Sequence, residues 1–305
     1  MEFPLEHRYY RYSYYLKKKF GEKVYKVSVD AGFTCPTRDG TLGTTGCIYC
    51  NNASFSPADR KVENIDTQIE EGINRLKKRG INKFLVYFQS YTNTYAPPEK
   101  LEKIYSTALE YEGVAGICIG TRPDCIDAEI LNLLDEFNKK TYVSLEIGIE
   151  SVYNKTLQWA KRGHDYATTK KVIGKIKQKD IHVSGHYILG IPTESREEML
   201  ASAAEINKLD IDAIKLHHLH IVKNTELANI YQKSPFKLFT AEKWVDFVVE
   251  YLEHLNSDIV IQRLMGDARG DTLLAPQWQM NKLEILNAIK KKLAEKDSYQ
   301  GAKTE

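Results

Sequence analysis

Apolar and β-branched residues recur along this chain in short runs that alternate with segments of helical spacing. Six runs predict strands, at residues 24–30, 84–88, 114–119, 142–149, 181–189 and 213–221. Between them, apolar residues return every three or four positions, as in Ile65, Ile69 and Ile73, which is the spacing of one helix face. Strands that alternate with helices form parallel sheets, since a parallel crossover needs about a dozen residues. The pattern predicts an α/β protein built as a partial (β/α)6 barrel.

The same pattern divides the chain into three parts. Residues 1–23 form an N-terminal segment rich in basic and aromatic side chains, and residues 24–235 form the predicted barrel. Residues 236–305 follow as a C-terminal α/β extension. In it we expect a helix over 241–255 with Thr240 as its N-cap, a strand over 259–264 and a basic helix over 280–296.

Composition narrows the class of protein further. With 305 residues the chain can bury a sizeable core, and its formal net charge of +2 says little about partners. No apolar run approaches the roughly 18 residues that span a bilayer, and the first residues lack the pattern of a secretory signal. The five cysteines, an odd number, favour a reducing compartment over disulfides. We therefore expect a cytoplasmic protein with no membrane segment.

Three of the cysteines form a C-x11-C-x2-C array directly after the first predicted strand, and we call Cys35, Cys47 and Cys50 the array cysteines. Thiolates select zinc, copper(I) or iron–sulfur clusters, and three of them leave one position of a tetrahedral ion or a cubane cluster open. The segment between the first two is predicted to be a loop whose backbone can approach a bound cluster closely. It contains three glycines, Gly40, Gly43 and Gly46.

Two other interpretations of the array stay open at this point. A structural zinc site would need a fourth ligand, yet no Cys or His occurs between Asn51 and Cys118. A thioredoxin-like redox pair of Cys47 and Cys50 would leave Cys35 without a role.

The array resembles the cluster-binding motif of radical S-adenosylmethionine (SAM) enzymes, C-x3-C-x-aromatic-C. Tyr49 occupies the aromatic position, which makes it a candidate SAM contact. The longer first spacing is similar to that of a subgroup around the catalytic subunit of elongator and its bacterial relatives. The resemblance implies that the array cysteines hold a [4Fe–4S] cluster whose free iron chelates SAM. It also implies cleavage of SAM to a 5′-deoxyadenosyl radical, with a reducing electron donor such as flavodoxin or ferredoxin.

Polar residues follow the predicted strands, at the edge where barrels of this type carry their active groups. Ser90, Thr92 and Asn93 follow the second strand, where the family has a Gly-rich segment that binds the SAM ammonium group. This chain lacks those glycines, and an ordinary solvated turn is the alternative. After the third strand, residues 121–124 read T-R-P-D, as in the elongator-like subgroup.

The fourth and fifth strands end in further segments that resemble SAM-binding elements. Glu150 and Ser151 stand where the subgroup has G-x-Q-S, with Glu150 in place of Gln. Arg162 lies in an R-G-H segment whose arginine pairs with the SAM carboxylate, a role that suits a two-point guanidinium fork. His186 stands in the place of a ribose-contacting residue. A surface arginine and a core histidine are the structural alternatives for the last two.

The sixth strand carries Lys215, His217, His218 and His220 within six residues. Alternation places Lys215 and His217 on one face and the other two on the opposite face, so at most half of them can point into the barrel. We expect substrate or proton-handling contacts here, from Lys215 and His218, in preference to a metal site.

Two features indicate RNA as the substrate. Residues 8–19 interleave cationic and aromatic side chains, which can neutralise phosphates and stack on unpaired bases, and residues 290–292 are three lysines. Packing of the tyrosines beneath the barrel and ordinary solvation of the lysines are the alternatives.

Across nearly the whole chain, the sequence resembles a bacterial radical SAM family that is linked to the aminomethyl modification of wobble uridine in tRNA. The resemblance implies tRNA as partner, conversion of a carboxymethylaminomethyl group to aminomethyl, and Arg263 and Arg269 as substrate contacts. A radical SAM enzyme for a small metabolite or peptide is one alternative, and a non-catalytic metal or iron–sulfur RNA-binding protein is another. Cys118 is expected to be a buried apolar group, whereas Cys125 is a candidate hydrogen-atom donor.

Overall fold

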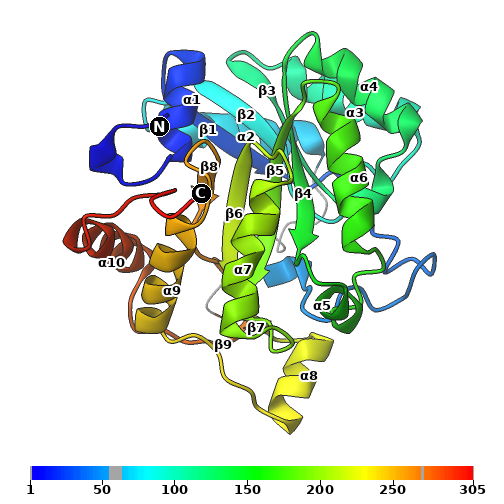
Figure 1. Ribbon diagram of the computed structural model, residues 1–305. Coiled ribbons are helices and arrows are strands. Elements are labelled where there is room, and N and C mark those ends of the chain that lie inside the picture. Colours follow the sequence, from blue (N-terminus) through cyan, green and yellow to red (C-terminus); the bar gives the residue numbers. More distant parts are fainter. Residues whose placement is uncertain (1, 55–63, 269–270, 305) are drawn as a thin grey trace.

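The computed structural model describes residues 2–54, 64–268 and 271–304. Within them, seven parallel strands form one sheet in the order β1-β2-β3-β4-β5-β6-β8, which curls into an open barrel (Figure 1). The strands are β1 (Val24–Val29), β2 (Lys83–Phe88), β3 (Val114–Thr121), β4 (Tyr142–Glu150), β5 (His182–Leu189), β6 (Ala213–His218) and β8 (Val260–Arg263). The predicted α/β partial barrel is confirmed, and the strand expected in the extension joins it as the seventh.

Helices cover the outer face of this sheet and connect its strands. The long connecting helices are α2 (Ile65–Lys77), α3 (Pro98–Leu109), α4 (Ala128–Asn138), α6 (Tyr166–Lys177), α7 (Arg196–Asn207) and α9 (Ala241–Glu253). Polar side chains fix where they start, since Asp127 caps α4, Asp165 caps α6 and Ser195 forms a capping box with Glu198 at α7. Two short helices, α5 (Asn154–Trp159) and α8 (Glu226–Lys233), lie beyond the carboxyl ends of the strands (Figure 1). The 3-10 turns η2 (Asn52–Ser54) and η3 (Pro123–Cys125) follow β1 and β3 along the chain.

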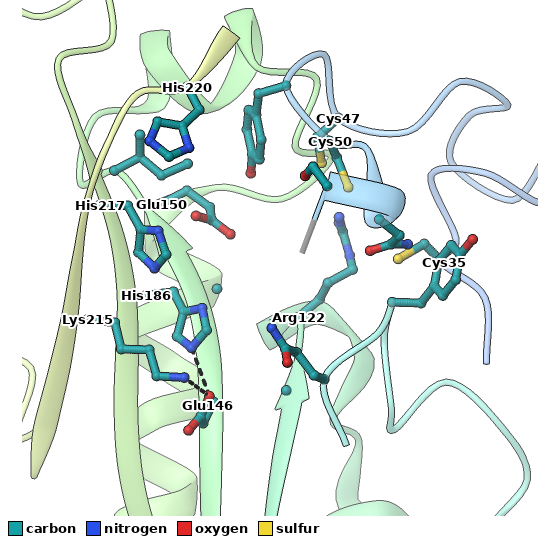
Figure 2. A pocket seen from close by; sticks show the side chains of 18 of the residues that line it. Cys35, Cys47, Cys50, Arg122, Glu146, Glu150, His186, Lys215, His217 and His220 are labelled. Carbon is teal, nitrogen blue, oxygen red and sulfur yellow. Dashed lines mark hydrogen bonds and ion pairs between the residues drawn. The ribbon is translucent and has the colours of Figure 1, made fainter. Parts of the chain in front are cut away.

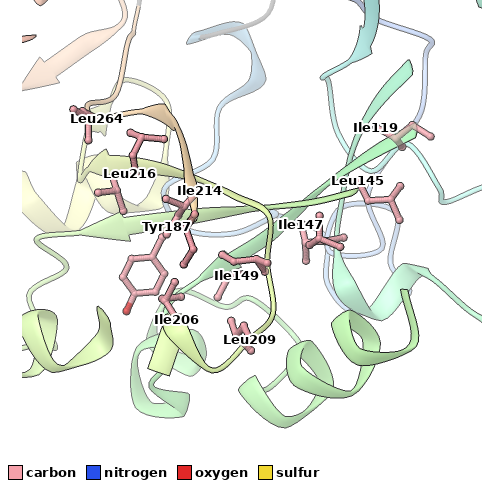
Figure 3. Close-up of a cluster of buried hydrophobic side chains, with 14 of the residues drawn as sticks. Ile119, Leu145, Ile147, Ile149, Tyr187, Ile206, Leu209, Ile214, Leu216 and Leu264 are labelled. Carbon is pink, nitrogen blue, oxygen red and sulfur yellow. The ribbon is translucent and has the colours of Figure 1, made fainter. Parts of the chain in front are cut away.

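The main core lies between the sheet and these helices. Alternate residues of each strand point outward, and Figure 3 shows Leu145 and Ile147 of β4 in the cluster that also holds Ile206 of α7. The intervening residues of β4 point into the barrel, where Ser144 and Glu146 are buried. A parallel barrel thus separates an apolar outer layer from a polar interior.

The C-terminal extension packs against the open edge of the barrel. After β6 the chain forms β7 (Ile221–Val222), which pairs antiparallel with β9 (Leu273–Ala275). The last helix, α10 (Lys282–Glu295), packs against α9 through buried residues such as Ile285 and Ile289. The helices expected over 241–255 and 280–296 are therefore both present. No helix in the described ranges is long and apolar enough to cross a bilayer.

The N-terminal segment closes the amino-terminal end of the barrel. After the 3-10 turn η1 (Leu5–His7), helix α1 (Tyr12–Phe20) lies beside β1 and β8 (Figure 1). Tyr10, Tyr12 and Tyr15 pack in clusters with the first residues of strands, which are Val24, Tyr142, Ala213 and Val260. The backbone N–H of Ile261 donates to the carbonyl of Tyr10 at 2.7 Å. The tyrosines of this segment therefore pack beneath the barrel, which was the structural alternative to RNA stacking.

Candidate active site

The array cysteines lie on the loop that follows β1, at the carboxyl end of the barrel, and they line one cavity (Figure 2). None of the three forms a disulfide. The loop is held in place from two sides, because Ile48 N–H donates to the carbonyl of Ala160 at 3.2 Å and Leu227 N–H donates to the carbonyl of Ile48 at 2.8 Å. No three His, Cys, Asp or Glu side chains in the described part of the chain are arranged to hold a metal ion.

Three guanidinium groups surround the array. Arg38 donates to the carbonyl of Cys50 at 2.7 Å, and Arg162 donates to the sulfur of Cys47 at 3.6 Å. Arg122 is close enough to lower the pKa of Cys35, which burial raises. Burial likewise raises the pKa of Cys50, to about 11, although Arg38 opposes the shift. These cations suit a negatively charged cluster of thiolates, iron and sulfide, because buried thiolates need nearby positive charge.

Glycines at two positions let the arginines approach. Gly46 has φ of +79°, and a Cβ there would lie 2.8 Å from the guanidinium of Arg38. A Cβ on Gly148 would lie 2.2 Å from Nη2 of Arg162. That same nitrogen donates to the Gly148 carbonyl at 3.1 Å and lies 3.4 Å from the carboxylate of Glu150. Packing of Arg162 against the end of β4 thus depends on the missing side chain.

Arg162 has a buried N–H group that donates to no protein atom among the described residues. Its Nε is buried without a protein partner among the described residues, as is Nη1 of Arg122. Glu150 faces the same cavity, and burial raises its pKa although Arg162 and Arg122 lower it. A cavity wall with unused guanidinium N–H groups and a carboxylate can bind the carboxylate and ammonium groups of an amino acid such as the methionyl part of SAM.

Five of the eight residues predicted to bind SAM line the cavity, namely Tyr49, Thr92, Glu150, Arg162 and His186. Thr92 Oγ1 also lies 2.8 Å from the Cys35 sulfur. The other three, Ser90, Asn93 and Ser151, do not line it. Asn93 donates to the carbonyls of Phe88 and Gly120 and so ties β2 to β3. Ser151 donates to Glu194 at 2.5 Å. These residues support the strand ends from behind the cavity wall.

A second set of polar side chains lies deeper in the barrel, and we call it the interior polar cluster. It consists of Lys26, Tyr87, Glu146, His186, Lys215, His217, Gln262 and Arg263, which come from six strands. Figure 2 shows Glu146, His186, Lys215 and His217 along the wall that faces the array cysteines. All except Lys26 and Gln262 line the same cavity as the array.

Glu146 is the centre of the interior polar cluster. Its side chain is fully buried and forms ion pairs with both Lys26 and Lys215. It also accepts a hydrogen bond from His186 Nε2 at 3.0 Å. Burial would raise the pKa of Glu146, yet Lys215 and Lys26 hold it well below its usual value. Glu146 is therefore a carboxylate, and His186 Nε2 carries the proton of their hydrogen bond.

The basic groups on the cavity side of Glu146, which are Lys215, His186 and His217, all have lowered pKa values. Burial, opposed by Glu146 and reinforced by Lys26, lowers the pKa of Lys215 to about 7. Burial and the charge of Lys215 lower the pKa of His186 to about 4. His217 has a pKa well below its usual value because of burial and the neighbouring Arg263, which lies 3.4 Å away. Both imidazoles are thus neutral, and Lys215 can gain or lose a proton near neutrality.

The predicted substrate residues are distributed as alternation requires. Lys215 and Arg263 point into the cavity as members of the interior polar cluster. His218 stacks on Trp278 with ring centroids 4.1 Å apart and accepts from Gly266 N–H at 3.3 Å, so it lies against the extension at the cavity wall. Arg269 lies outside the described residues.

Several residues of the site were not selected from the sequence. Lys26 and Glu146 are charged residues in the middle of apolar strands, a signal that was present but not used. Cys118 lies in the middle of β3, where it is fully buried in a cluster with Leu16 and Tyr87, as expected for an apolar group. Cys125 is also buried, and this burial, with the neighbouring charge of Asp124, raises its pKa to about 12. It does not line the cavity.

Comparisons with known proteins agree with this geometry. The model of the Radical SAM superfamily matches residues 40–206, and that of the Radical_SAM C-terminal domain matches residues 211–295. YtqA, an uncharacterized protein of Bacillus subtilis (strain 168), is 35% identical over 298 residues, which are 97% of this chain and 92% of that protein.

Two further proteins are more distantly similar. The tRNA uridine(34) acetyltransferase of Methanocaldococcus jannaschii is 30% identical over 154 residues, which are 49% of this chain and 27% of that enzyme. The structure of the archaeal Methanocaldococcus infernus Elp3 with an N-terminal deletion has a TM-score of 0.69 at 20% identity, over 91% of this chain and 64% of that chain. This last likeness is one of fold.

The family match covers more than half of the chain and includes two of the three array cysteines. The thiol array, its three guanidinium neighbours and the unpartnered N–H groups of the cavity fit the cofactors of that family. The chain belongs to the radical SAM superfamily, whose members bind a [4Fe–4S] cluster and SAM.

Proposed function

We propose that this chain is a radical SAM enzyme that acts on the C5 side chain of the wobble uridine in tRNA and converts a carboxymethylaminomethyl group to aminomethyl. The methylene carbon next to the carboxylate would lose a hydrogen atom to the 5′-deoxyadenosyl radical and then one electron to the oxidised form of the electron carrier. Water would hydrolyse the resulting imine, which breaks the bond between nitrogen and that carbon and releases the two lost carbons as glyoxylate. When bound, the cluster and SAM supply a 5′-deoxyadenosyl radical, with electrons from a donor such as flavodoxin or ferredoxin. The array cysteines act as the cluster ligands. Tyr49, Thr92, Glu150, Arg162 and His186 contact SAM, with Arg162 on its carboxylate.

The observation that carries the proposal is that the array cysteines and most of the interior polar cluster line the same cavity. The array and its arginines occupy one end, and the interior polar cluster faces them from β4, β5, β6 and β8. A reactive centre and a place for a polar side chain therefore adjoin each other. An unpaired base of an anticodon loop can be turned into such a cavity at low unstacking cost. The similarity of half the chain to a tRNA uridine(34) acetyltransferase supports wobble uridine as the target.

The test compares wobble nucleosides between a parent strain and a strain that lacks the gene. We expect carboxymethylaminomethyluridine to accumulate and aminomethyluridine to disappear in the deletion strain, as measured by mass spectrometry of digested tRNA. Complementation with the wild-type gene should restore the parent profile, and a Cys50→Ser gene should not. Identical profiles in parent and deletion strains would contradict the proposed substrate.

A radical SAM enzyme for a small metabolite or peptide is the second candidate, and one observation favours it. The basic and aromatic residues 8–19 pack at the amino-terminal end of the barrel, opposite the array, so they are not placed to guide RNA into the cavity. The two candidates differ in salt dependence. Binding of tRNA must weaken steeply with salt because phosphates are neutralised, whereas binding of a small substrate would change little.

A further inference from the structure

The charges in the barrel interior do not balance. Lys26, Lys215 and Arg263 are cations, and the one carboxylate that contacts any of them within the described residues is Glu146. The two other carboxylates that line the cavity are engaged elsewhere. Glu150 lies 3.4 Å from Arg162, and Asp267 forms an ion pair with Lys282 at 2.7 Å. Since His186 and His217 are neutral, this region holds two positive charges in excess when Lys215 is protonated and one when it is not.

The excess charge faces the cavity. Lys26 does not line the cavity and reaches Glu146 from the side of β1, where its ammonium group also donates to Gln262 at 3.1 Å. Lys26 and Lys215 therefore share Glu146 as their counterion, with Lys26 outside the cavity wall and Lys215 on its cavity side. Only 6% of the Lys215 side chain is exposed, and Tyr87 Oη lies 3.2 Å from its ammonium group.

Arg263 adds a guanidinium group with free donors next to Lys215. Its one hydrogen bond among the described residues joins Nη1 to His217 Nε2 at 3.4 Å. A guanidinium can donate two parallel hydrogen bonds to a carboxylate, and burial of the adjoining groups strengthens such an interaction. Because β6 and β8 are neighbours in the sheet, Lys215 pairs directly with Arg263 in register.

We propose that Arg263, Lys215 and His217 form a carboxylate-binding site for the substrate, separate from the Arg162 side of the cavity that takes the SAM carboxylate. This inference rests on the proposed function and specifies its substrate: the group held here is the terminal carboxylate of the carboxymethylaminomethyl side chain. Binding at Arg263 would fix the methylene carbon next to that carboxylate between the interior polar cluster and the array. The aminomethyl product lacks the carboxylate and would leave readily.

The experiment measures binding to the anaerobically reconstituted holoenzyme with SAM present. One probe is an anticodon stem-loop RNA that carries carboxymethylaminomethyluridine at the wobble position, and its partner is the same RNA with aminomethyluridine. Their phosphates are identical, so the ratio of affinities reports on the carboxymethyl group and not on the RNA backbone. N-methylglycine and its amide form a second pair that does not need RNA. The variants are Arg263→Gln and Lys215→Met, with Lys175→Gln on the exposed face of α6 as the control.

We expect the wild-type enzyme to bind the carboxylate-bearing form of each pair at least ten times more tightly than the form that lacks the carboxylate. Arg263→Gln and Lys215→Met should each reduce that ratio to about the level of no preference, whereas Lys175→Gln should leave it unchanged. Equal affinities for both forms in the wild type, or an intact ratio in both Arg263→Gln and Lys215→Met, would overturn the carboxylate site.

Product analysis of the same samples keeps the two proposals apart. Conversion of the acid RNA to the aminomethyl form after reduction tests the proposed function. A carboxylate preference without conversion would support the carboxylate site and contradict the proposed reaction. Conversion without a carboxylate preference would support the reaction and contradict the site.

Discussion

Replacing Glu146 by Gln is the most informative perturbation of the barrel interior. The substitution keeps the shape of the side chain and removes the one carboxylate that offsets the charges of Lys26 and Lys215. The exposed fractions of these two lysine side chains are 17% and 6%, so water can solvate neither fully. The variant therefore leaves two buried ammonium groups beside a neutral amide.

The size of the effect follows from burial. Removing one partner of a buried ion pair costs about 3 to 5 kcal/mol of folding free energy, because the other charge stays buried. With an unfolding entropy of roughly 2.1 cal/mol/K per residue, a chain of 305 residues should lose about 5 to 8 °C in melting temperature. Lys215 can escape part of this cost by losing its proton, since its pKa is already lowered to about 7 by burial. The loss of stability should therefore be larger near pH 6 than near pH 9.

Anaerobic urea unfolding followed by tryptophan fluorescence measures this difference. The matched control is Glu226→Gln, which removes the same chemical group from an ion pair with Lys161 whose side chains are 36% and 54% exposed. That control should cost less than about 1 kcal/mol at either pH. The reasoning about the interior would be refuted if Glu146→Gln were as mild as Glu226→Gln at both pH values.

Three further predictions concern the cofactors and the response to acid. Serine in place of any array cysteine should abolish the absorbance of the reconstituted cluster and lower the bound iron, whereas Cys118→Ser should retain about four irons per chain; retention in the array variants would contradict their role. Gly148→Ala should weaken SAM binding at least tenfold in equilibrium titrations, because the new Cβ displaces Arg162. The control is Gly174→Ala, whose new Cβ has nothing within 4 Å. It should bind SAM normally and gain about 0.5 to 1 kcal/mol of stability. Burial lowers the pKa of His182 from 6.5 to about 4, so the unfolded chain binds the extra proton in that window and stability should fall as the pH drops from 6.5 to 4. Unfolding midpoints of His182→Gln should fall less steeply, and equal slopes would argue against a neutral buried imidazole.

The strands and the array could be predicted from the sequence because each depends on local information. The apolar runs of a parallel barrel are continuous, and the loop after the first of them carries three cysteines at a recognisable spacing. The seventh strand was expected at 259–264, but its membership of the barrel was not. That pairing depends on contacts between β6 and β8, which are separated by more than forty residues, and no local pattern reports it.

The orientation of polar side chains was harder to predict. Ser90, Asn93 and Ser151 lie near strand ends, as SAM contacts should, yet Asn93 and Ser151 hydrogen-bond to the strands and loops behind the cavity. A hydroxyl or amide can serve a ligand or the backbone equally well, and only the three-dimensional arrangement decides. Lys26 and Glu146 could have been found, because a charged residue inside a buried strand needs a partner on a neighbouring strand.

The N-terminal segment shows why composition alone misassigns surfaces. Tyrosines interleaved with lysines suit RNA binding, but they also suit a helix that buries its rings and leaves its ammonium groups in water. In α1 the rings of Tyr12 and Tyr15 pack under the barrel, while Lys17 and Lys18 are exposed.

The central claim is that the array cysteines hold a cluster with one iron open to SAM. Its most direct test is the reduction of anaerobically reconstituted protein in the presence of SAM, followed by quantification of 5′-deoxyadenosine and methionine. We predict equal amounts of both products from the wild-type chain and none from the array variants. A chain that binds only zinc, or that carries a full cluster and yields no 5′-deoxyadenosine, would contradict the claim.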